Sequence, residues 1–99
     1  MVVVMSRFRV INEMEADVER AFRERPHLVD GAPGFLGLEA LVDDRDPRVF
    51  YLITRWSDME SFRSWHGGAA HRESHRFIPR GLRLDPTYTA VWHLRKVSD

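Results

Sequence analysis

Three histidines and a tryptophan crowd into one short segment of this 99-residue chain. The segment, residues 65–75, reads WHGGAAHRESH and contains Trp65, His66, His71 and His75. An imidazole can ligate a metal in its neutral form, transfer protons near neutral pH, or cover the polar face of a helix. Spacing, and the elements that hold the rings, decide which of these roles the segment supports.

A zinc site is the first alternative for these rings. His71 and His75 are four residues apart, so a helix places both on one face, where two imidazoles can share an ion. Zinc proteases use H-E-x-x-H, with the glutamate directly after the first histidine. Here the order is HRESH, Glu73 faces away from the pair, and no third ligand is evident. The sequence therefore disfavours zinc, and a solvated polar helix face fits His66 and His71 better.

A haem or aromatic-ligand pocket is the second alternative. It requires a neutral imidazole, apolar walls and a polar group on the opposite side. His75 is followed by Phe77 and Ile78, and Trp65 lies at the edge of a helical apolar face. Ser6 is the polar exception on an apolar strand face. Core packing explains Trp65 alone and surface exposure explains His75 alone, but together with Ser6 they form a pocket hypothesis.

Other chemistries find little support. No G-x-S-x-G motif is present, and the glycine-rich GAPGFLG (residues 31–37) leads from helix into strand, the wrong direction for a phosphate loop. The absence of cysteine excludes disulfides and thiolate chemistry. Fifteen basic residues balance fifteen acidic ones, which gives no electrostatic case for a nucleic-acid or membrane partner. The N-terminal segment is apolar only briefly, so we expect a cytoplasmic protein.

Hydrophobic periodicity predicts the elements that must position these residues. Alternation predicts strands over residues 2–11, 35–42, 49–56 and 88–94. Helical spacing predicts one helix that begins with a capping box, Asn12-x-x-Glu15, and ends before Pro26. A second capping box, Ser57-x-x-Glu60, begins another helix, which Gly67-Gly68 interrupts and residues 69–77 resume at a new angle.

The predicted order β-α-β-β-α-β is the ferredoxin-like split βαβ plan, an α+β fold in a single domain of residues 1–99. Two helices cover one face of a four-stranded antiparallel sheet, and the apolar residues on the other face need a cover. A second copy of the chain would supply it. Trp56, Tyr88 and Trp92 are strand aromatics available for such an interface.

Four segments carry a family resemblance: MSRFRV, APGFLGLEAL, YLITRW and F-R-S-W-x9-H. In this order and spacing they resemble the antibiotic biosynthesis monooxygenase (ABM) superfamily over roughly Val2 to Leu94. The nearest branch resembles the bacterial haem-degrading monooxygenases of the IsdG type. The resemblance implies a homodimer whose two ferredoxin-like sheets close into a dimeric α/β barrel.

The resemblance also implies site residues. The haem-degrading branch has an asparagine on the first strand, a tryptophan on the second long helix, and a histidine ten residues later that ligates haem iron. Trp65 and His75 match the latter two, whereas Ser6 stands where the asparagine is expected. Trp65 would then distort the haem and Ser6 would support the distal side. Phe62 and Arg76 are further candidate haem contacts.

The same resemblance implies the reactants. Haem would be both cofactor and substrate, O2 the co-substrate, and the electrons would come from an external donor. Arg72, Arg76 and Arg80 are candidates to pair with haem propionates.

Two other functions stay open on the same fold. One is a cofactor-independent monooxygenase of quinols or polyketide-type aromatics, with His75 or His71 as the base. The other is a non-enzymatic dimer that binds haem or another small ligand, which the serine at position 6 favours.

Overall fold

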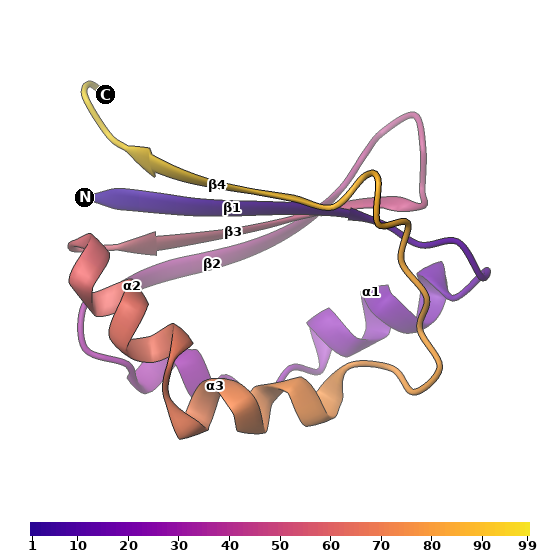
Figure 1. The fold of residues 1–99 in the computed structure, drawn as a ribbon, viewed down its shortest axis with the longest axis horizontal. Coiled ribbons are helices and arrows are strands. Elements are labelled where there is room, and N and C mark those ends of the chain that lie inside the picture. Colours follow the sequence, from indigo (N-terminus) through magenta and orange to yellow (C-terminus); the bar gives the residue numbers. More distant parts are fainter.

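A four-stranded antiparallel sheet, in the order β2-β3-β1-β4, forms one layer of the computed structural model, which describes residues 1–99. The helices form the second layer, all on one face of the sheet (Figure 1). The elements are β1 (Val2–Arg9), α1 (Glu15–Arg23), η1 (Leu28–Gly31), β2 (Phe35–Val42), β3 (Val49–Trp56), α2 (Met59–His66), α3 (Ala69–Ser74), η2 (His75–Phe77) and β4 (Ala90–Arg95). The predicted β-α-β-β-α-β order is confirmed. No helix has the length and apolar run that a membrane crossing needs.

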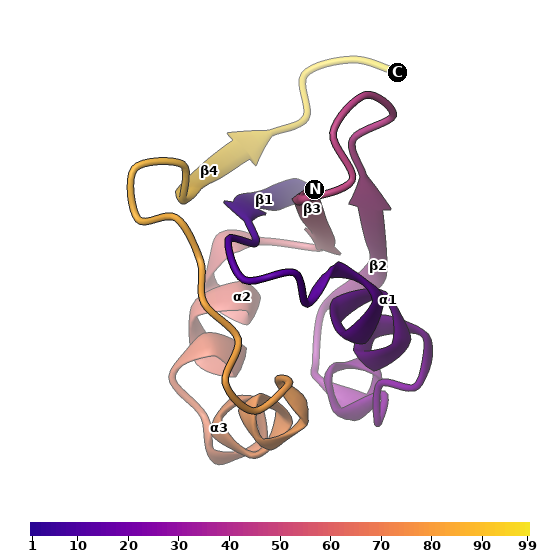
Figure 2. The same cartoon turned by 90° about the vertical axis from the view of Figure 1, so that its right-hand side faces the viewer.

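Strand register assigns each side chain to one face of the sheet. β1 pairs with β3 on one side and β4 on the other, so Val4 lies beside Thr54 and His93. Val4 is 6% exposed and packs with Val29 of η1, which identifies this as the helix-covered face. The intervening residues of each strand therefore lie on the face that the helices leave open (Figure 2).

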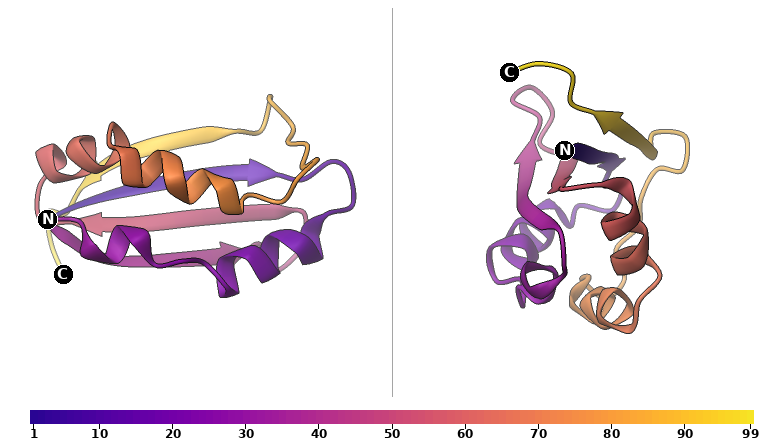
Figure 3. Two further views of the ribbon diagram at one scale, coloured as in Figure 1. Left: turned by 90° about the horizontal axis from the view of Figure 1, so that it is seen from below. Right: turned by 90° about the vertical axis from the view of Figure 1, so that its left-hand side faces the viewer.

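Six of the seven buried side chains form two separate clusters under the helix layer, and Val49 is the seventh. One joins Val4, Val29 and Trp56. The other joins Val10, Val18 and Phe50. Seen from below the sheet, η1 and α1 follow one path across this face, and α2 and α3 follow another (Figure 3).

Trp56 belongs to the core and not to an interface. Its side chain is 0% exposed, and its ring meets Phe35 and Phe62 edge to face. The indole N–H donates to Thr54 Oγ1 at 2.9 Å, which satisfies its one polar group. The prediction that Trp56 is available for a second copy is therefore wrong, because register puts it on the helix-covered face.

Two strand boundaries differ from the predictions by two residues. β1 ends at Arg9, and Val10 makes only an isolated bridge with Leu84. β4 begins at Ala90 and not at Tyr88, because Tyr88 N–H closes a turn onto the carbonyl of Asp85 at 3.1 Å. Val10 and Tyr88 are residue types that favour strands, but Val10 forms an isolated bridge and Tyr88 lies in a turn.

Both predicted capping boxes are wrong. α1 has no side-chain cap; Asn12 instead donates to the carbonyl of Gly81 at 2.8 Å and accepts from Arg83 N–H at 3.3 Å. At α2 the cap is Asp58, whose carboxylate accepts from Ser61 N–H at 2.8 Å. This position is one residue after the predicted Ser57.

The glycine-rich turn brings the start of β2 against the start of α2. Gly34 has φ +80°, a conformation that side chains rarely adopt, and an added Cβ would collide with the Ser57 and Ser61 side chains. The carbonyl of Gly34 accepts from Ser57 N–H at 2.8 Å. The turn thus fixes the position at which α2 leaves the sheet.

Candidate functional site

A row of four side chains crosses the helix-covered face between the two core clusters. This central row consists of Ala40, Leu52, Ser6 and Val91, which neighbour one another in the strand register. None of the four is buried, and Val91 is 58% exposed although it faces the helix layer. The helices therefore cover the two ends of this face and leave its middle accessible to a ligand.

Ser6 places a polar group in the central row. Its side chain is half-buried, and its hydroxyl makes no hydrogen bond within the chain. Its neighbours, Leu52 and Val91, are apolar. The structure thus confirms that Ser6 is a polar exception on the apolar, helix-covered face. Ser6 makes no hydrogen bond with Trp65 or His75, so its distal role stays a prediction.

The break at Gly67-Gly68 separates two short helices, as predicted: α2 ends at His66, and α3 begins at Ala69. α3 then packs against η1, which comes from the other half of the chain. This change of direction returns His71 toward α2, so that its ring lies 4.5 Å from that of His66. The break therefore gathers the rings of the segment into one cluster.

Trp65 connects this ring cluster to the protein core. Its half-buried side chain packs against the core cluster of Val4, Val29 and Trp56. On the other side its ring meets His71 edge to face, with the centroids 5.8 Å apart. Phe62, one turn earlier on α2, packs in the same cluster and lies edge to face with Trp56 and His93. Both side chains therefore form an apolar wall.

His71 lies at the centre of the ring cluster and is not simply solvated. The predicted solvated face is correct for His66, which is exposed, but wrong for half-buried His71. Burial, followed by the neighbouring His75 and His66, lowers the pKa of His71. The Nε2 atoms of His71 and His75 are 3.2 Å apart. At neutral pH His71 is therefore a neutral imidazole in contact with the predicted haem ligand.

His75 is exposed at the C-terminal end of α3, where it opens η2. The apolar residues that follow are also exposed, with Phe77 and Ile78 both at 51%. Phe77 and Pro79 line a cavity of about 340 Å³ against α1, which contributes Arg20 and Ala21. An accessible imidazole that exposed apolar residues follow directly in the chain suits a flat, apolar ligand that carries its own metal.

The predicted propionate-binding arginines differ in their availability. Arg76 donates to the Glu73 carboxylate at 2.8 Å, and Arg72 donates to the carbonyl of Gly67 at 3.2 Å. Arg80 is exposed and forms no ion pair. Of the three guanidinium groups, that of Arg80 is therefore the most readily available to an anionic ligand.

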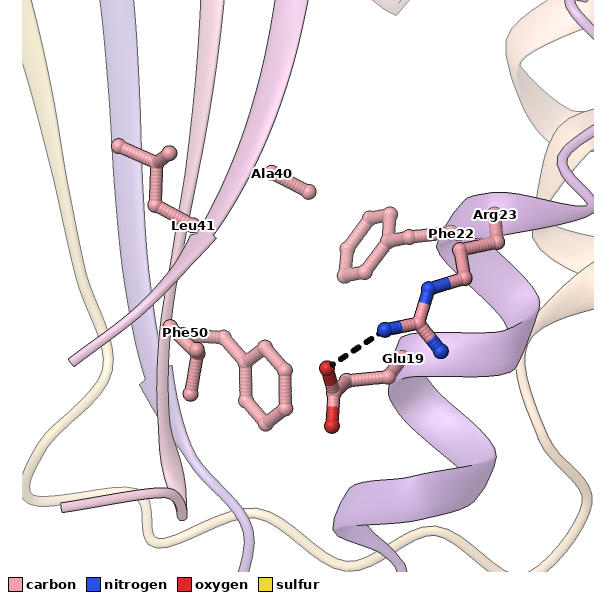
Figure 4. Close-up of a pocket in the computed structure, with 7 residues that line it drawn as sticks. Glu19, Phe22, Arg23, Ala40, Leu41 and Phe50 are labelled. Carbon is pink, nitrogen blue, oxygen red and sulfur yellow. Dashed lines mark hydrogen bonds and ion pairs between the residues drawn. The ribbon is translucent and has the colours of Figure 1, made fainter. Parts of the chain in front are cut away.

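A second cavity, of about 150 Å³, lies between α1 and strands β2 and β3 (Figure 4). Phe22 and Phe50 form its apolar side, and the ion pair of Glu19 with Arg23 borders it. It adjoins the central row at Ala40 and contains no predicted site residue.

Sequence reasoning missed His93. Register places it on the helix-covered face opposite Val4, and its ring centroid lies 5.6 Å from that of Phe62. Alternation within the last strand could have revealed this, because His93 shares a side with Val91. No group of three or more histidine, cysteine or carboxylate side chains is arranged to hold a metal ion.

The chain matches an established protein family. The sequence pattern of the antibiotic biosynthesis monooxygenase family matches residues 1–76. A haem oxygenase (mycobilin-producing) of Mycobacterium tuberculosis is 35% identical over 66 residues, which cover 64% of this chain and 62% of that relative. The matched region thus spans less than two thirds of the curated relative.

Solved structures extend the likeness over the whole chain. The haem degrader MhuD of Mycobacterium tuberculosis, with two haems bound in its active site, has a TM-score of 0.75 and 27% identity. That match covers 100% of this chain and 98% of MhuD. SnoaB of Streptomyces nogalater, a cofactor-independent oxygenase, shares the fold, with a TM-score of 0.78, 18% identity, and coverage of 99% of this chain and 94% of SnoaB. This chain, with its ferredoxin-like α+β fold, belongs to the antibiotic biosynthesis monooxygenase family.

Proposed function

We propose that this protein is a haem-degrading monooxygenase that binds haem as its substrate and opens the ring with O2. The observation that carries the proposal is the exposed imidazole of His75, which exposed Phe77 and Ile78 follow within three residues along the chain. The names of the curated relative and of MhuD support the same substrate.

The donor set fits haem better than a free structural metal. A structural zinc site needs four protein ligands, and no cluster of three candidate ligands exists in this chain. Haem brings four ring nitrogens of its own, so one histidine is enough to attach the iron. His75 offers that imidazole. The central row, which the helices leave accessible in the middle of the helix-covered face, offers apolar surface for the porphyrin.

Each proposed site residue has one task. His75 would ligate the iron, Trp65 and Phe62 would form the wall against which the ring is shaped, and the free hydroxyl of Ser6 would hydrogen-bond on the opposite side. Arg80 would pair with a propionate, and Arg76 would do so after releasing Glu73. Bound haem would supply the iron that activates O2, with electrons from an external donor.

We further propose that the chain forms a homodimer through the open face of its sheet. Val3, Met5, Tyr51 and Ile53 lie on that face, and Leu41 and Leu94 there are each 45% exposed. Arg7 stacks on Tyr88 and Trp92 at 4.0 and 5.4 Å, which places both aromatics beside this surface. A dimer in sedimentation analysis supports this arrangement, and a monomer at micromolar concentration contradicts it.

Turnover of added hemin tests the enzymatic part of the proposal. Protein loaded with one equivalent of hemin, given ascorbate and O2, should lose its Soret band and release iron that ferrozine captures. The His75→Ala variant under the same conditions is the matched control. Haem that binds to wild type and survives unchanged would indicate the non-enzymatic carrier.

A cofactor-independent aromatic monooxygenase is a second candidate, and one observation favours it. The lowered pKa of His71 keeps its imidazole neutral at pH 7, the form that a general base needs. Oxygen uptake with a panel of dihydroquinones and haem-free protein tests this candidate. Uptake that His71→Gln abolishes would support it over haem degradation.

A further inference from the structure

Two imidazoles, one on α3 and one at the start of η2, are spaced like two ligands of one metal ion. His71 and His75 lie one helical turn apart, with Nε2 atoms 3.2 Å apart and ring planes 69° apart. Zinc–nitrogen bonds of about 2.0–2.1 Å at a tetrahedral angle separate two nitrogens by about 3.3 Å. The two nitrogens are therefore already at a chelating separation, and the ring centroids, now 4.4 Å apart, have to move apart for both Nε2 atoms to face one ion.

Both rings are suitable and accessible ligands. His75 is exposed, and His71 is half-buried, so an ion can approach from solvent on the His75 side. Metal binding requires the neutral form of both imidazoles. Holding the two rings on adjoining helical segments also reduces the entropy lost when both bind the same ion.

The surroundings limit which ion would bind. Arg72 is a nearby positive charge that acts on His71, and the Glu73 carboxylate is engaged by Arg76. No third histidine or carboxylate completes a cage, so water must fill the other positions of the ion. Among the first-row divalent metals, Cu²⁺ binds imidazole nitrogens most strongly and therefore tolerates a two-ligand site best.

We propose that His71 and His75 form a two-imidazole chelate for a free divalent transition-metal ion, and that an ion held there prevents His75 from binding haem. Nε2 of His75 can bind only one metal at a time. The first half of this proposal is independent of the proposed function, whereas the second half rests on His75 as the haem ligand.

Calorimetric titration of the haem-free full-length chain with Cu²⁺ tests the chelate. Wild type should bind one histidine-dependent Cu²⁺ per chain, and His71→Gln and His75→Gln should each weaken that binding at least tenfold. His66→Gln and His27→Gln are matched controls that should leave it unchanged, because neither ring is part of the pair. Wild-type affinity in either His71→Gln or His75→Gln would overturn the proposal.

An NMR titration of wild type locates the bound ion without any variant that can misfold. Substoichiometric Cu²⁺ should broaden the amide signals of α3 and η2 first in a nitrogen-15 NMR spectrum. Broadening centred on His27 or His93 would overturn the proposed location.

Hemin titration after saturation with Cu²⁺ tests the second half. Hemin affinity should fall at least tenfold in wild type and remain unchanged by Cu²⁺ in His71→Gln. Unchanged hemin affinity in wild type would overturn the competition and leave the chelate standing. A protein that never shifts the hemin Soret band would overturn the competition together with the proposed function, while the Cu²⁺ titration still decides the chelate.

Discussion

The indole of Trp65 meets the imidazole of His71 edge to face, with ring centroids 5.8 Å apart, across the break between α2 and α3. Trp65 thus packs against the core on one side and supports the histidine cluster on the other. Trp65 therefore contributes to the stability of the fold and also to the placement of His75, because His71 contacts both Trp65 and His75.

Truncation of Trp65 should therefore destabilise the protein. Full removal of a buried tryptophan costs about 3–5 kcal/mol, and this half-buried ring should cost about 2 kcal/mol in Trp65→Ala. Trp65→Phe keeps an aromatic wall and should lose less than about 1 kcal/mol. Urea unfolding measures both values. A loss below about 0.5 kcal/mol in Trp65→Ala would show that the ring is not packed as described.

Ser6→Asn should raise the rate of haem degradation several-fold. Ser6 lies in the uncovered central row with an unpaired hydroxyl, and the longer asparagine adds an N–H donor that reaches further from the strand. Iron release from hemin-loaded protein with ascorbate measures the rate. Ser6→Ala removes the hydroxyl and should lower the rate of haem degradation. Equal rates in all three proteins would place position 6 away from the reacting side of the haem.

Asp58, and not Ser57, should govern the start of α2. The Asp58 carboxylate accepts from both the backbone N–H and the hydroxyl of Ser61, each at 2.8 Å. Asp58→Ala should lower the melting temperature by a few degrees. Ser57→Ala should change it much less. The reverse order of the two variants would restore the capping box that the sequence pattern indicates.

The ion pair of Arg9 with Asp85 should give stability that acid removes. The Arg9 hydrogen bond, followed by those from Thr87, lowers the pKa of Asp85 from 3.8 to about 2. A carboxyl whose pKa is lower in the folded state stabilises the protein fully above its unfolded-state pKa. That contribution is lost as the pH falls from about 4 through about 2.

NMR titration of the Asp85 carboxyl checks this pH dependence. The midpoint should lie near 2 in wild type and rise toward 3.8 in Arg9→Gln. Arg20→Gln, which removes the exposed pair with Asp17, should not move it. An unchanged Asp85 midpoint in Arg9→Gln would show that Arg9 does not hold this carboxyl.

Local patterns predicted the elements well but their ends poorly. Alternation in residues 2–9 and 49–56 specifies strands because each face has its own environment. Asn12 resembles a helix cap in sequence, but its amide bonds to Gly81 and Arg83, about 70 residues away. A local rule cannot anticipate a partner so distant along the chain.

The same limit applies to the site. The sequence predicted the interval from Trp65 to His75 and the break at Gly67-Gly68, because both depend on local spacing. The half-burial of His71 depends on how α3 turns back onto α2 and η1, and the exposure of the central row depends on how far apart the helices lie. Both depend on tertiary packing, which residue spacing does not determine.

Hemin titration of wild type, His75→Ala and His66→Ala, followed through the Soret band, tests the central claim most directly. His66 is the matched control, because it is an exposed histidine of the same cluster that is not proposed to ligate iron. Wild type and His66→Ala should show a saturable Soret shift, and His75→Ala should not. The same saturable shift in His75→Ala, or none in wild type, would contradict that claim.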